Sequence, residues 1–315
     1  MKAIIVTGFG SSSPSLRSRT FDPIMSEARR KFPGYDVRLA FLGGMVVERI
    51  RSRGMEAESL EGTLDKAVSE GWEEAAVLPA LPIAGNQFRQ VQSICEGFTD
   101  RIPSLLLCDP LLSSRDSMEE FLNVLPEVYP EAFERHSGLV MMGHGRGMEA
   151  DRSLCQLQHL SNMRGMGAFF TTVTGTPSPE DVAKMMRRAN VERAVLAPLM
   201  FEAGYHARRD MAGERDSVKS FIISTGFEAE CVMRGLGEYP EFRRMFLSRF
   251  ESMLKRSRRT HGNRRGASER PLFPETISHI SSTIWVLYLS VRWYSTSLPD
   301  FSVPTRPALR RMVRL

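Results

Sequence analysis

The chain has 315 residues, of which 42% are apolar, enough to bury a full hydrophobic core in one or two domains. Its formal net charge is +5, but residues 256–315 carry 11 Arg and no Lys against three acidic residues. The preceding 255 residues hold 31 basic and 34 acidic residues, a net charge of −3. The basic character therefore belongs to the C-terminal segment, and the near-neutral body argues against a nucleic-acid-binding protein.

The cysteines and the N-terminus indicate a cytoplasmic protein. The four cysteines lack CxxC spacing and lie mostly in apolar runs, as reduced, buried thiols do. The apolar stretch at residues 1–10 is too short for a signal peptide and is predicted to be a first strand. The run Ile284–Val291 has about half of the roughly 20 residues that a membrane span needs, so no membrane span is expected.

Short apolar runs alternate with amphipathic segments over the first 255 residues, which is typical of successive βαβ units. The predicted strands are Ala3–Thr7, Asp36–Phe41, Ala75–Leu81, Ser104–Cys108, Gly138–Met142, Gly167–Val173, Arg193–Met200 and Glu228–Met233. The predicted helices are Pro23–Lys31, Val46–Arg53, Ser59–Glu70, Asn86–Thr99, Ser114–Leu125, Ala150–Met163, Pro179–Arg188, Arg209–Phe221 and Glu241–Arg256.

The two halves of this body resemble each other. The run Ile4-Ile-Val-Thr-Gly-Phe-Gly10 matches Leu139-Val-Met-Met-Gly-His-Gly145, and residues 76–85 match residues 194–204. We therefore predict an α/β protein with an N-terminal lobe at residues 1–130 and a C-terminal lobe at 131–255. Each lobe has a four-stranded parallel sheet flanked by helices, with a cleft between them. Residues 256–315 form a basic segment without helical period, predicted to be a disordered or aberrant extension.

Two histidines follow predicted strands of the second half. His144 stands in Gly-His-Gly-Arg-Gly, and His206 in Ala-Gly-Tyr-His-Ala. Because the carboxyl ends of parallel strands meet at one edge of a sheet, both imidazoles are expected at the same rim. A neutral imidazole accepts a proton near pH 7 and also binds divalent transition metals, so either role fits the pair.

Charged and polar residues near these histidines are further candidates. Glu202 and Asp210 lie four residues on either side of His206, and a carboxylate there could neutralise a dication or orient an imidazole. Arg146 and Arg208 flank the histidines and suit a polycarboxylate ligand. The Phe9-Gly10-Ser11 segment could receive an anionic group on its loop amides, but it lacks the residues of a P-loop or a dinucleotide fingerprint.

At these residues the chain resembles the anaerobic sirohydrochlorin cobaltochelatases, class II metal chelatases of cobalamin biosynthesis, over about residues 1–255. The matching motifs are Gly8-Phe-Gly-Ser-Ser12, Phe41-Leu-Gly-Gly-Met45, Pro110-Leu-Leu-Ser-Ser114, Met142-Gly-His-Gly145, Ala197-Pro-Leu-Met200, Ala203-Gly-Tyr-His-Ala207, Asp210-Met-Ala212 and Gly235-Leu-Gly-Glu238. The resemblance implies the chelatase fold, a tetrapyrrole of the sirohydrochlorin or precorrin-2 type between the lobes, Co²⁺ as the substrate metal and no organic cofactor.

By this resemblance His144 and His206 match the family's metal-binding, catalytic histidines, and Phe9, Gly10, Ser11, Arg146 and Arg208 would contact the substrate. The family's third site residue is a glutamate, which Thr174 replaces in Val173-Thr-Gly-Thr-Pro177. The family's usual histidine after Leu81 is also missing. These departures predict weakened or lost activity unless Glu202 or another acid compensates.

Three functions follow as alternatives: a cobaltochelatase, a chelatase for Fe or Ni, or a tetrapyrrole or metal carrier that lost turnover with the glutamate. No nucleic-acid or membrane partner is expected, and a homo-oligomer is left open.

Overall fold

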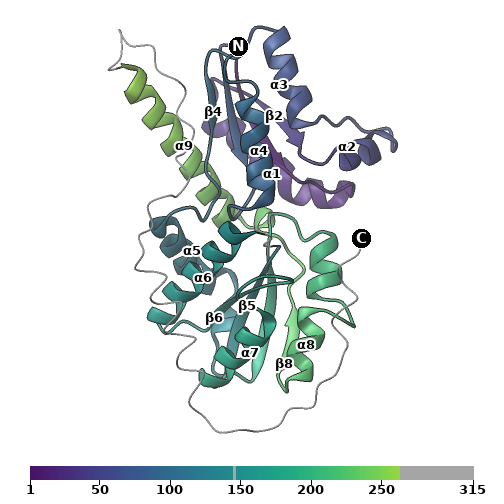
Figure 1. The fold of residues 1–315 in the computed structure, drawn as a ribbon, viewed down its shortest axis with the longest axis vertical. Coiled ribbons are helices and arrows are strands. Elements are labelled where there is room, and N and C mark those ends of the chain that lie inside the picture. Colours follow the sequence, from purple (N-terminus) through teal and green to yellow (C-terminus); the bar gives the residue numbers. More distant parts are fainter. Residues whose placement is uncertain (145–146, 263–315) are drawn as a thin grey trace. The chain divides into compact units, whose positions relative to one another are not determined.

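The computed structural model describes residues 1–144 and 147–262, and its strands form two four-stranded parallel sheets (Figure 1). The first sheet has the order β2-β1-β3-β4, with β1 Lys2–Gly8, β2 Asp36–Phe41, β3 Glu74–Pro79 and β4 Leu105–Leu107. The second has the order β6-β5-β7-β8, with β5 Ser137–Gly143, β6 Ala168–Thr172, β7 Arg193–Leu199 and β8 Glu228–Cys231. The predicted fold class is confirmed.

Helices flank both sheets. They are α1 Pro14–Lys31, α2 Gly44–Arg51, α3 Leu60–Ser69, α4 Asn86–Glu96, α5 Arg115–Val128, α6 Met148–Met163, α7 Pro179–Arg188, α8 Val218–Ser224 and α9 Pro240–Gly262. Short turns of 3-10 helix occupy Pro130–Phe133 and Leu236–Glu238. We call the first sheet with the helices packed on it the first lobe, and the second sheet with its helices the second lobe.

The strand residues alternate between separate parts of the core. In β1, Ile4 and Val6 belong to a large cluster that also contains Leu139 and Met141 of β5, so this cluster runs through both lobes. The intervening residues of the two strands face a second cluster in the first lobe and a third in the second lobe. Each sheet is thus buried on both faces, which explains why the strands appear as continuous apolar runs in the sequence.

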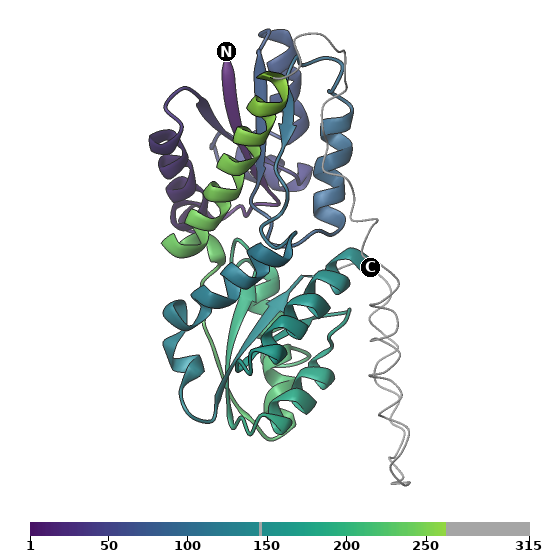
Figure 2. The ribbon, with the colours of Figure 1, turned by 90° about the vertical axis from the view of Figure 1, so that its left-hand side faces the viewer.

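Helices α5 and α9 do not follow a simple division of the chain near residue 130. Helix α5 packs on α6 of the second lobe, where Arg164 Nη1 donates a hydrogen bond of 2.9 Å to Asn123 Oδ1. Helix α9 follows the second lobe in sequence but lies along the first (Figure 2). There Arg243 pairs with Glu27 of α1 at 2.7 Å, and the rings of Phe250 and Phe32 stack edge to face.

Three predicted segments differ from the structure. Helix α1 begins at Pro14 rather than Pro23, because Leu16 and Phe21 pack into the core and the helix continues through Pro23. The predicted helix Arg209–Phe221 is wrong: a π-helical turn at Ala207–Met211 is followed by the separate helix α8, which the Ser217 side chain caps. Helix α9 runs to Gly262, so the basic segment predicted from residue 256 begins within a helix, and its remainder lies outside the described residues.

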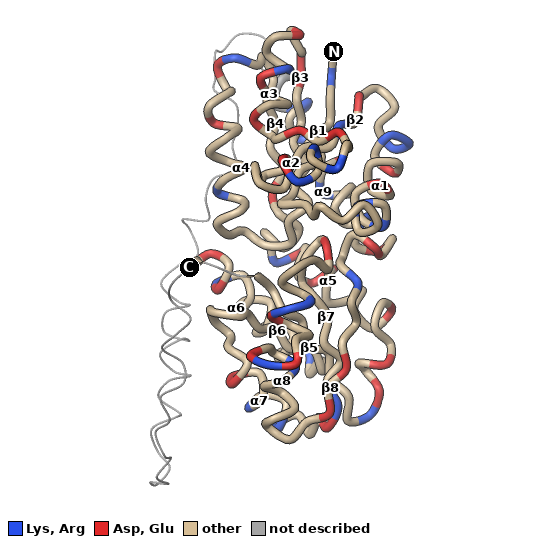
Figure 3. The backbone as a smooth tube through the Cα atoms, turned by 90° about the vertical axis from the view of Figure 1, so that its right-hand side faces the viewer, with Lys and Arg blue, Asp and Glu red and all other residues tan. Residues whose placement is uncertain are grey.

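Acidic and basic residues are interspersed along both lobes, as Figure 3 shows, in keeping with the near-neutral charge of the body. Within residues 1–144 and 147–262, no helix combines the length and apolar character needed to cross a membrane.

Candidate functional site

His144 and His206 lie face to face at the carboxyl edge of the second sheet. Their ring centroids are 3.8 Å apart and the ring planes are inclined by 32°. His144 follows β5 directly, and His206 comes seven residues after β7, the neighbouring strand. Parallel pairing brings the ends of these strands to one edge, so two residues 62 positions apart in the chain become neighbours.

The π-helical turn fixes the position of His206. Ala207 and Met211, at either end of the turn, are buried in the core of the second lobe, whereas Tyr205 is exposed. The turn also brings Asp210 to the imidazole, whose Nδ1–H donates a hydrogen bond of 2.6 Å to Asp210 Oδ2. This contact orients the ring and leaves Nε2 for a proton or a metal ion.

Large apolar side chains are exposed beside the ends of four strands. Phe9 follows β1, Met45 follows β2, Met148 follows β5 and Tyr205 follows β7, and each is between 47% and 81% exposed. The ring of Phe9 approaches Gly43, where a Cβ atom would lie 3.7 Å from it. We call these four residues the apolar rim. Such exposure costs free energy in water, and several exposed apolar side chains at one edge are typical of a ligand-binding surface.

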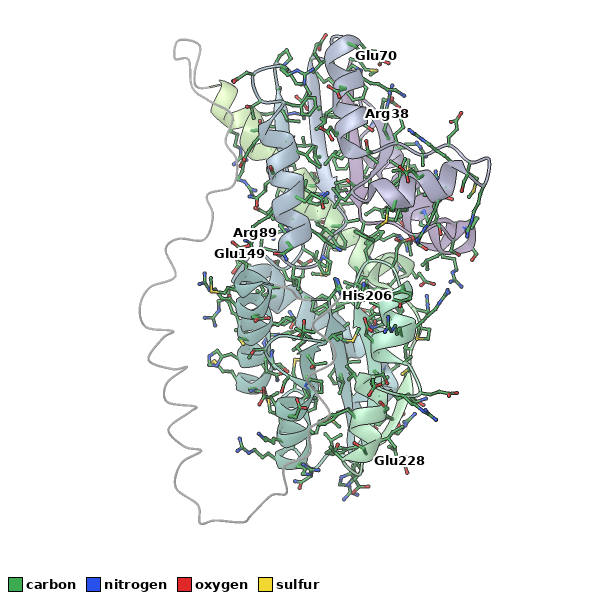
Figure 4. All side chains as sticks on the ribbon, turned by 45° about the vertical axis from the view of Figure 1, so that its right-hand side comes forward. Arg38, Glu70, Arg89, Glu149, His206 and Glu228 are labelled. Carbon is green, nitrogen blue, oxygen red and sulfur yellow. The ribbon has the colours of Figure 1, made fainter. Side chains whose placement is uncertain are left out.

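Contacts between the lobes involve residues close in sequence to the two histidines. Arg89 at the start of α4 pairs with Glu149 at the start of α6, with Nε and Oε2 3.1 Å apart (Figure 4). The Phe21 and Phe201 rings, one from each lobe, lie 4.9 Å apart. Figure 4 places His206 at the end of the second lobe that faces the first. The histidines are therefore built on the second lobe, next to residues of the first.

Glu202 is directed toward α1. Its Oε1 accepts a hydrogen bond of 3.4 Å from the Thr20 hydroxyl. The pKa of this carboxyl group is raised to about 7, mainly by burial; the Thr20 hydrogen bond lowers it and the nearby Glu238 raises it. The carboxylate that contacts His206 is that of Asp210, which the sequence suggested only as one of several acids.

The remaining candidates belong to segments that follow strands of both sheets. Gly10 has a φ of +81° and lies so close to Phe41 that a side chain there would collide with the ring, so this loop requires glycine. Ser11 is half-buried, Arg208 and Thr174 are exposed, and Arg146 lies outside the described residues. Within the described part of the chain, no group of three His, Cys, Asp or Glu side chains is placed to hold a metal ion.

Sequence reasoning missed two members of the apolar rim, Met45 and Met148. Each lies in the first turn of a helix that follows a buried strand, and its side chain is not packed in the core. A large apolar residue at the start of a helix after a buried strand was the sequence feature that could have identified them. Met141 and Met142 of β5, by contrast, are fully buried in the core.

Known proteins are similar to this chain in sequence and in fold. The sirohydrochlorin cobaltochelatase of Salmonella typhimurium is 27% identical over 255 residues, which cover 80% of this chain and 96% of that protein. The sirohydrochlorin cobaltochelatase CbiKC of Nitratidesulfovibrio vulgaris is 27% identical over 246 residues, 76% of this chain and 86% of that protein. The structure of SirB from Bacillus subtilis with Fe³⁺ superposes with a TM-score of 0.56 at 14% identity, covering 82% of this chain and 98% of SirB.

The family model described as cobalt chelatase (CbiK) matches residues 2–255, which include both sheets and both histidines. The match covers well over half of the chain and agrees with the two-sheet fold and with the curated relatives. The chain therefore belongs to the CbiK family of cobalt chelatases.

Proposed function

We propose that this protein is a sirohydrochlorin cobaltochelatase, which inserts Co²⁺ into a tetrapyrrole of the sirohydrochlorin or precorrin-2 type in anaerobic cobalamin biosynthesis. The observation that carries the proposal is the pair of imidazoles 3.8 Å apart at a strand edge, with Asp210 holding one of them. The names of the two curated relatives support the choice of metal and macrocycle.

Insertion must remove two pyrrole N–H protons and exchange the water ligands of the ion for four ring nitrogens. His144 and His206 hold the substrate dication on one side of the macrocycle. As the ion passes to the ring nitrogens of the macrocycle, the imidazole lone pairs that it leaves accept the two pyrrole protons, which then pass to water. Because Asp210 accepts the Nδ1 proton of His206, the Nε2 lone pair of that ring is directed to the ion or the proton.

The macrocycle itself lies on the apolar rim. Phe9 and Tyr205 provide ring faces for a flat aromatic ligand, and Met45 and Met148 provide flexible, polarisable side chains that adapt to its outline. Arg146 and Arg208 pair with the peripheral carboxylates of the ring. Binding energy gained at these distant contacts bends the ring toward the geometry in which its nitrogens reach the metal.

The proposal is tested with purified protein, sirohydrochlorin and Co²⁺, followed by absorbance. The wild-type protein should accelerate the cobalt-dependent spectral change, and His144→Ala and His206→Ala should each abolish the acceleration. His159→Ala is the matched control, because His159 is exposed on α6 and should leave the rate unchanged. Insertion at the wild-type rate by both site variants would overturn the assignment. Comparing rates with Fe²⁺ and Ni²⁺ decides the metal.

A tetrapyrrole or metal carrier is the second candidate. It is favoured by the exposed Thr174, which stands where the resemblance places a glutamate, and by the lack of a three-residue metal-binding group among the described residues. Binding of sirohydrochlorin without any cobalt-dependent spectral change would select this function over catalysis.

A further inference from the structure

The loop that follows β6, residues 173–177, has an acidic neighbour on another element. This loop carries Thr174 and has no acidic residue of its own. Beside it stands Asp151, in the first turn of α6. Asp151 Oδ1 is so close to Gly175 that a Cβ atom added to that glycine would lie 2.2 Å from it. Gly175 thus provides the space that the Asp151 carboxylate occupies.

Asp151 lies in the helix that follows the loop after β5. Its backbone N–H donates a first-turn hydrogen bond of 3.2 Å to the carbonyl oxygen of Gly147, three residues after His144. The carboxylate therefore lies beside the loop that carries Thr174, on the helix that follows the segment beginning with His144. Both segments leave the carboxyl edge of the second sheet, where β5 and β6 are neighbours.

The Oδ1 atom of Asp151 is buried and has no hydrogen-bond partner within the described part of the chain. It is the only carboxylate oxygen in that condition among the described residues, the other such atoms being Thr7 Oγ1, Tyr129 OH and Arg249 Nε. Removing a carboxylate oxygen from water without a partner is costly, and the amino-terminal end of α6 offsets only part of that cost. This oxygen atom therefore lacks a partner that carries a positive charge or donates a hydrogen bond.

We propose that Asp151 supplies, from helix α6, the negative charge that the loop after β6 lacks, and that it accepts hydrogen bonds from water ligands of the substrate dication at the histidine pair. This inference rests on the proposed function, because it takes the dication to be the substrate. Asp151 binds through water, since no acidic side chain among the described residues completes a three-residue metal-binding group with the two imidazoles. The site thus keeps a negative charge, but position 151 carries it instead of position 174.

The proposal makes positions 151 and 174 two alternative places for one charge. Asp151→Asn should weaken Co²⁺ binding about 10-fold, as the loss of an outer-shell partner of a metal site does. Thr174→Glu in the Asp151→Asn background should restore the affinity to within about threefold of wild type. Thr174→Glu in the otherwise wild-type protein should raise the Co²⁺ affinity by a smaller factor than it does in the Asp151→Asn background. In the single variant the new carboxylate at position 174 would lie near that of Asp151, on the other side of Gly175, and the two would repel each other.

The experiment is a titration of the full-length protein with Co²⁺ alone, followed by the visible absorption of the bound ion, with insertion of cobalt into sirohydrochlorin measured on the same samples. Glu180→Gln is the matched control: it is also a first-turn acid beside this loop, but it is exposed, and its affinity should stay within twofold of wild type. Thermal unfolding of each variant checks that the fold is intact.

The proposal is overturned if Asp151→Asn binds Co²⁺ within twofold of wild type, or if Thr174→Glu/Asp151→Asn binds no tighter than Asp151→Asn. Either result together with normal insertion by the wild type would leave the proposed function standing. Conversely, the predicted pattern of Co²⁺ affinities without any insertion would support the role of Asp151 and refute the chelatase activity.

Discussion

The two lobes share one topology but differ at the ends of matching strands. Strand orders β2-β1-β3-β4 and β6-β5-β7-β8 are the same pattern, in which β1 corresponds to β5 and β3 to β7. After these strands the first lobe has Phe9 and Gln87, whereas the second has His144 and His206. The two lobes share one scaffold, and the imidazoles are found on only one of them.

The difference between the lobes extends beyond the histidines. Four residues after His206 the second lobe has Asp210, which holds the imidazole, whereas four residues after Gln87 the first lobe has Val91, buried in its core. Glu202 of the second lobe corresponds to Ile83 of the first. The polar residues that orient and charge the site are therefore specific to the second lobe, and the first offers mainly apolar surface.

Helix α9 breaks the similarity most strongly, because it follows the second lobe in sequence and packs on the first. Its Arg243, only 8% exposed, pairs with Glu27 of α1 and donates to the Gly237 carbonyl oxygen. Arg243→Ala leaves the Glu27 charge without its partner and should lower the free energy of unfolding by about 3–5 kcal/mol, measured by urea denaturation. The exposed Arg244→Ala should cost less than about 1 kcal/mol, and equal losses for both would contradict this role for α9.

Glu202 makes the stability of the second lobe depend on pH. Burial raises its pKa from 4.5 to about 7, so the folded state keeps a proton that the unfolded state loses. Stability should therefore fall as the pH rises from about 4.5 through 7, by about 3 kcal/mol in total. Glu202→Gln cannot ionise, and urea denaturation should show it more stable than wild type at pH 8 by about that amount and similar near pH 4.5.

The insertion rate of the same Glu202 variant separates two accounts of the missing glutamate. If Asp151 supplies the charge, Glu202→Gln should insert cobalt at a rate close to that of wild type. If Glu202→Gln instead lowered the insertion rate as much as Asp151→Asn does, Glu202 would be the residue that compensates for the missing glutamate.

The sequence predicted the parts of this molecule that depend on local pattern. Strand Asp36–Phe41 and helix Pro179–Arg188 were predicted with their observed bounds, because a short, mostly apolar run and the Ser178 cap with Pro179 are local signals. The proximity of His144 and His206, though not their role, followed from the rule that parallel strands end at one edge.

What could not be predicted depends on residues distant in the chain. The exchange of α5 and α9 between lobes is decided by contacts such as Arg243 with Glu27, 216 residues apart. The π-helical turn at Ala207–Met211 has the composition of an ordinary helix and is held by the burial of its two end residues. Asp151 and Gly175 lie on two different elements, and no periodic pattern in the sequence predicts that they are in contact.

Asp210→Asn tests the orientation of His206. The amide cannot accept the Nδ1 hydrogen bond with the strength of a carboxylate, so the ring is held less firmly. We expect cobalt insertion to fall about 10- to 100-fold with little change in thermal stability. Glu214→Gln, an exposed acid in the segment that follows the π-helical turn, should insert at the wild-type rate. Retention of activity within twofold by Asp210→Asn would remove the positioning role.

The smallest effects are expected at Phe9, the counterpart of His144 in the first lobe. Phe9→Ala removes a partly exposed ring from the apolar rim and should weaken sirohydrochlorin binding about 3- to 10-fold, measured by titration, without changing Co²⁺ affinity. Phe9→His goes further and gives the first lobe the residue that the second has. It should not raise Co²⁺ affinity, because helix α4, which follows the strand paired with β1, carries Gln87 where the second lobe has an imidazole and the buried Val91 where it has the carboxylate. Tighter Co²⁺ binding by Phe9→His would mean that both lobes can bind the metal, and that the single side chain at position 9 restricts metal binding to the second lobe.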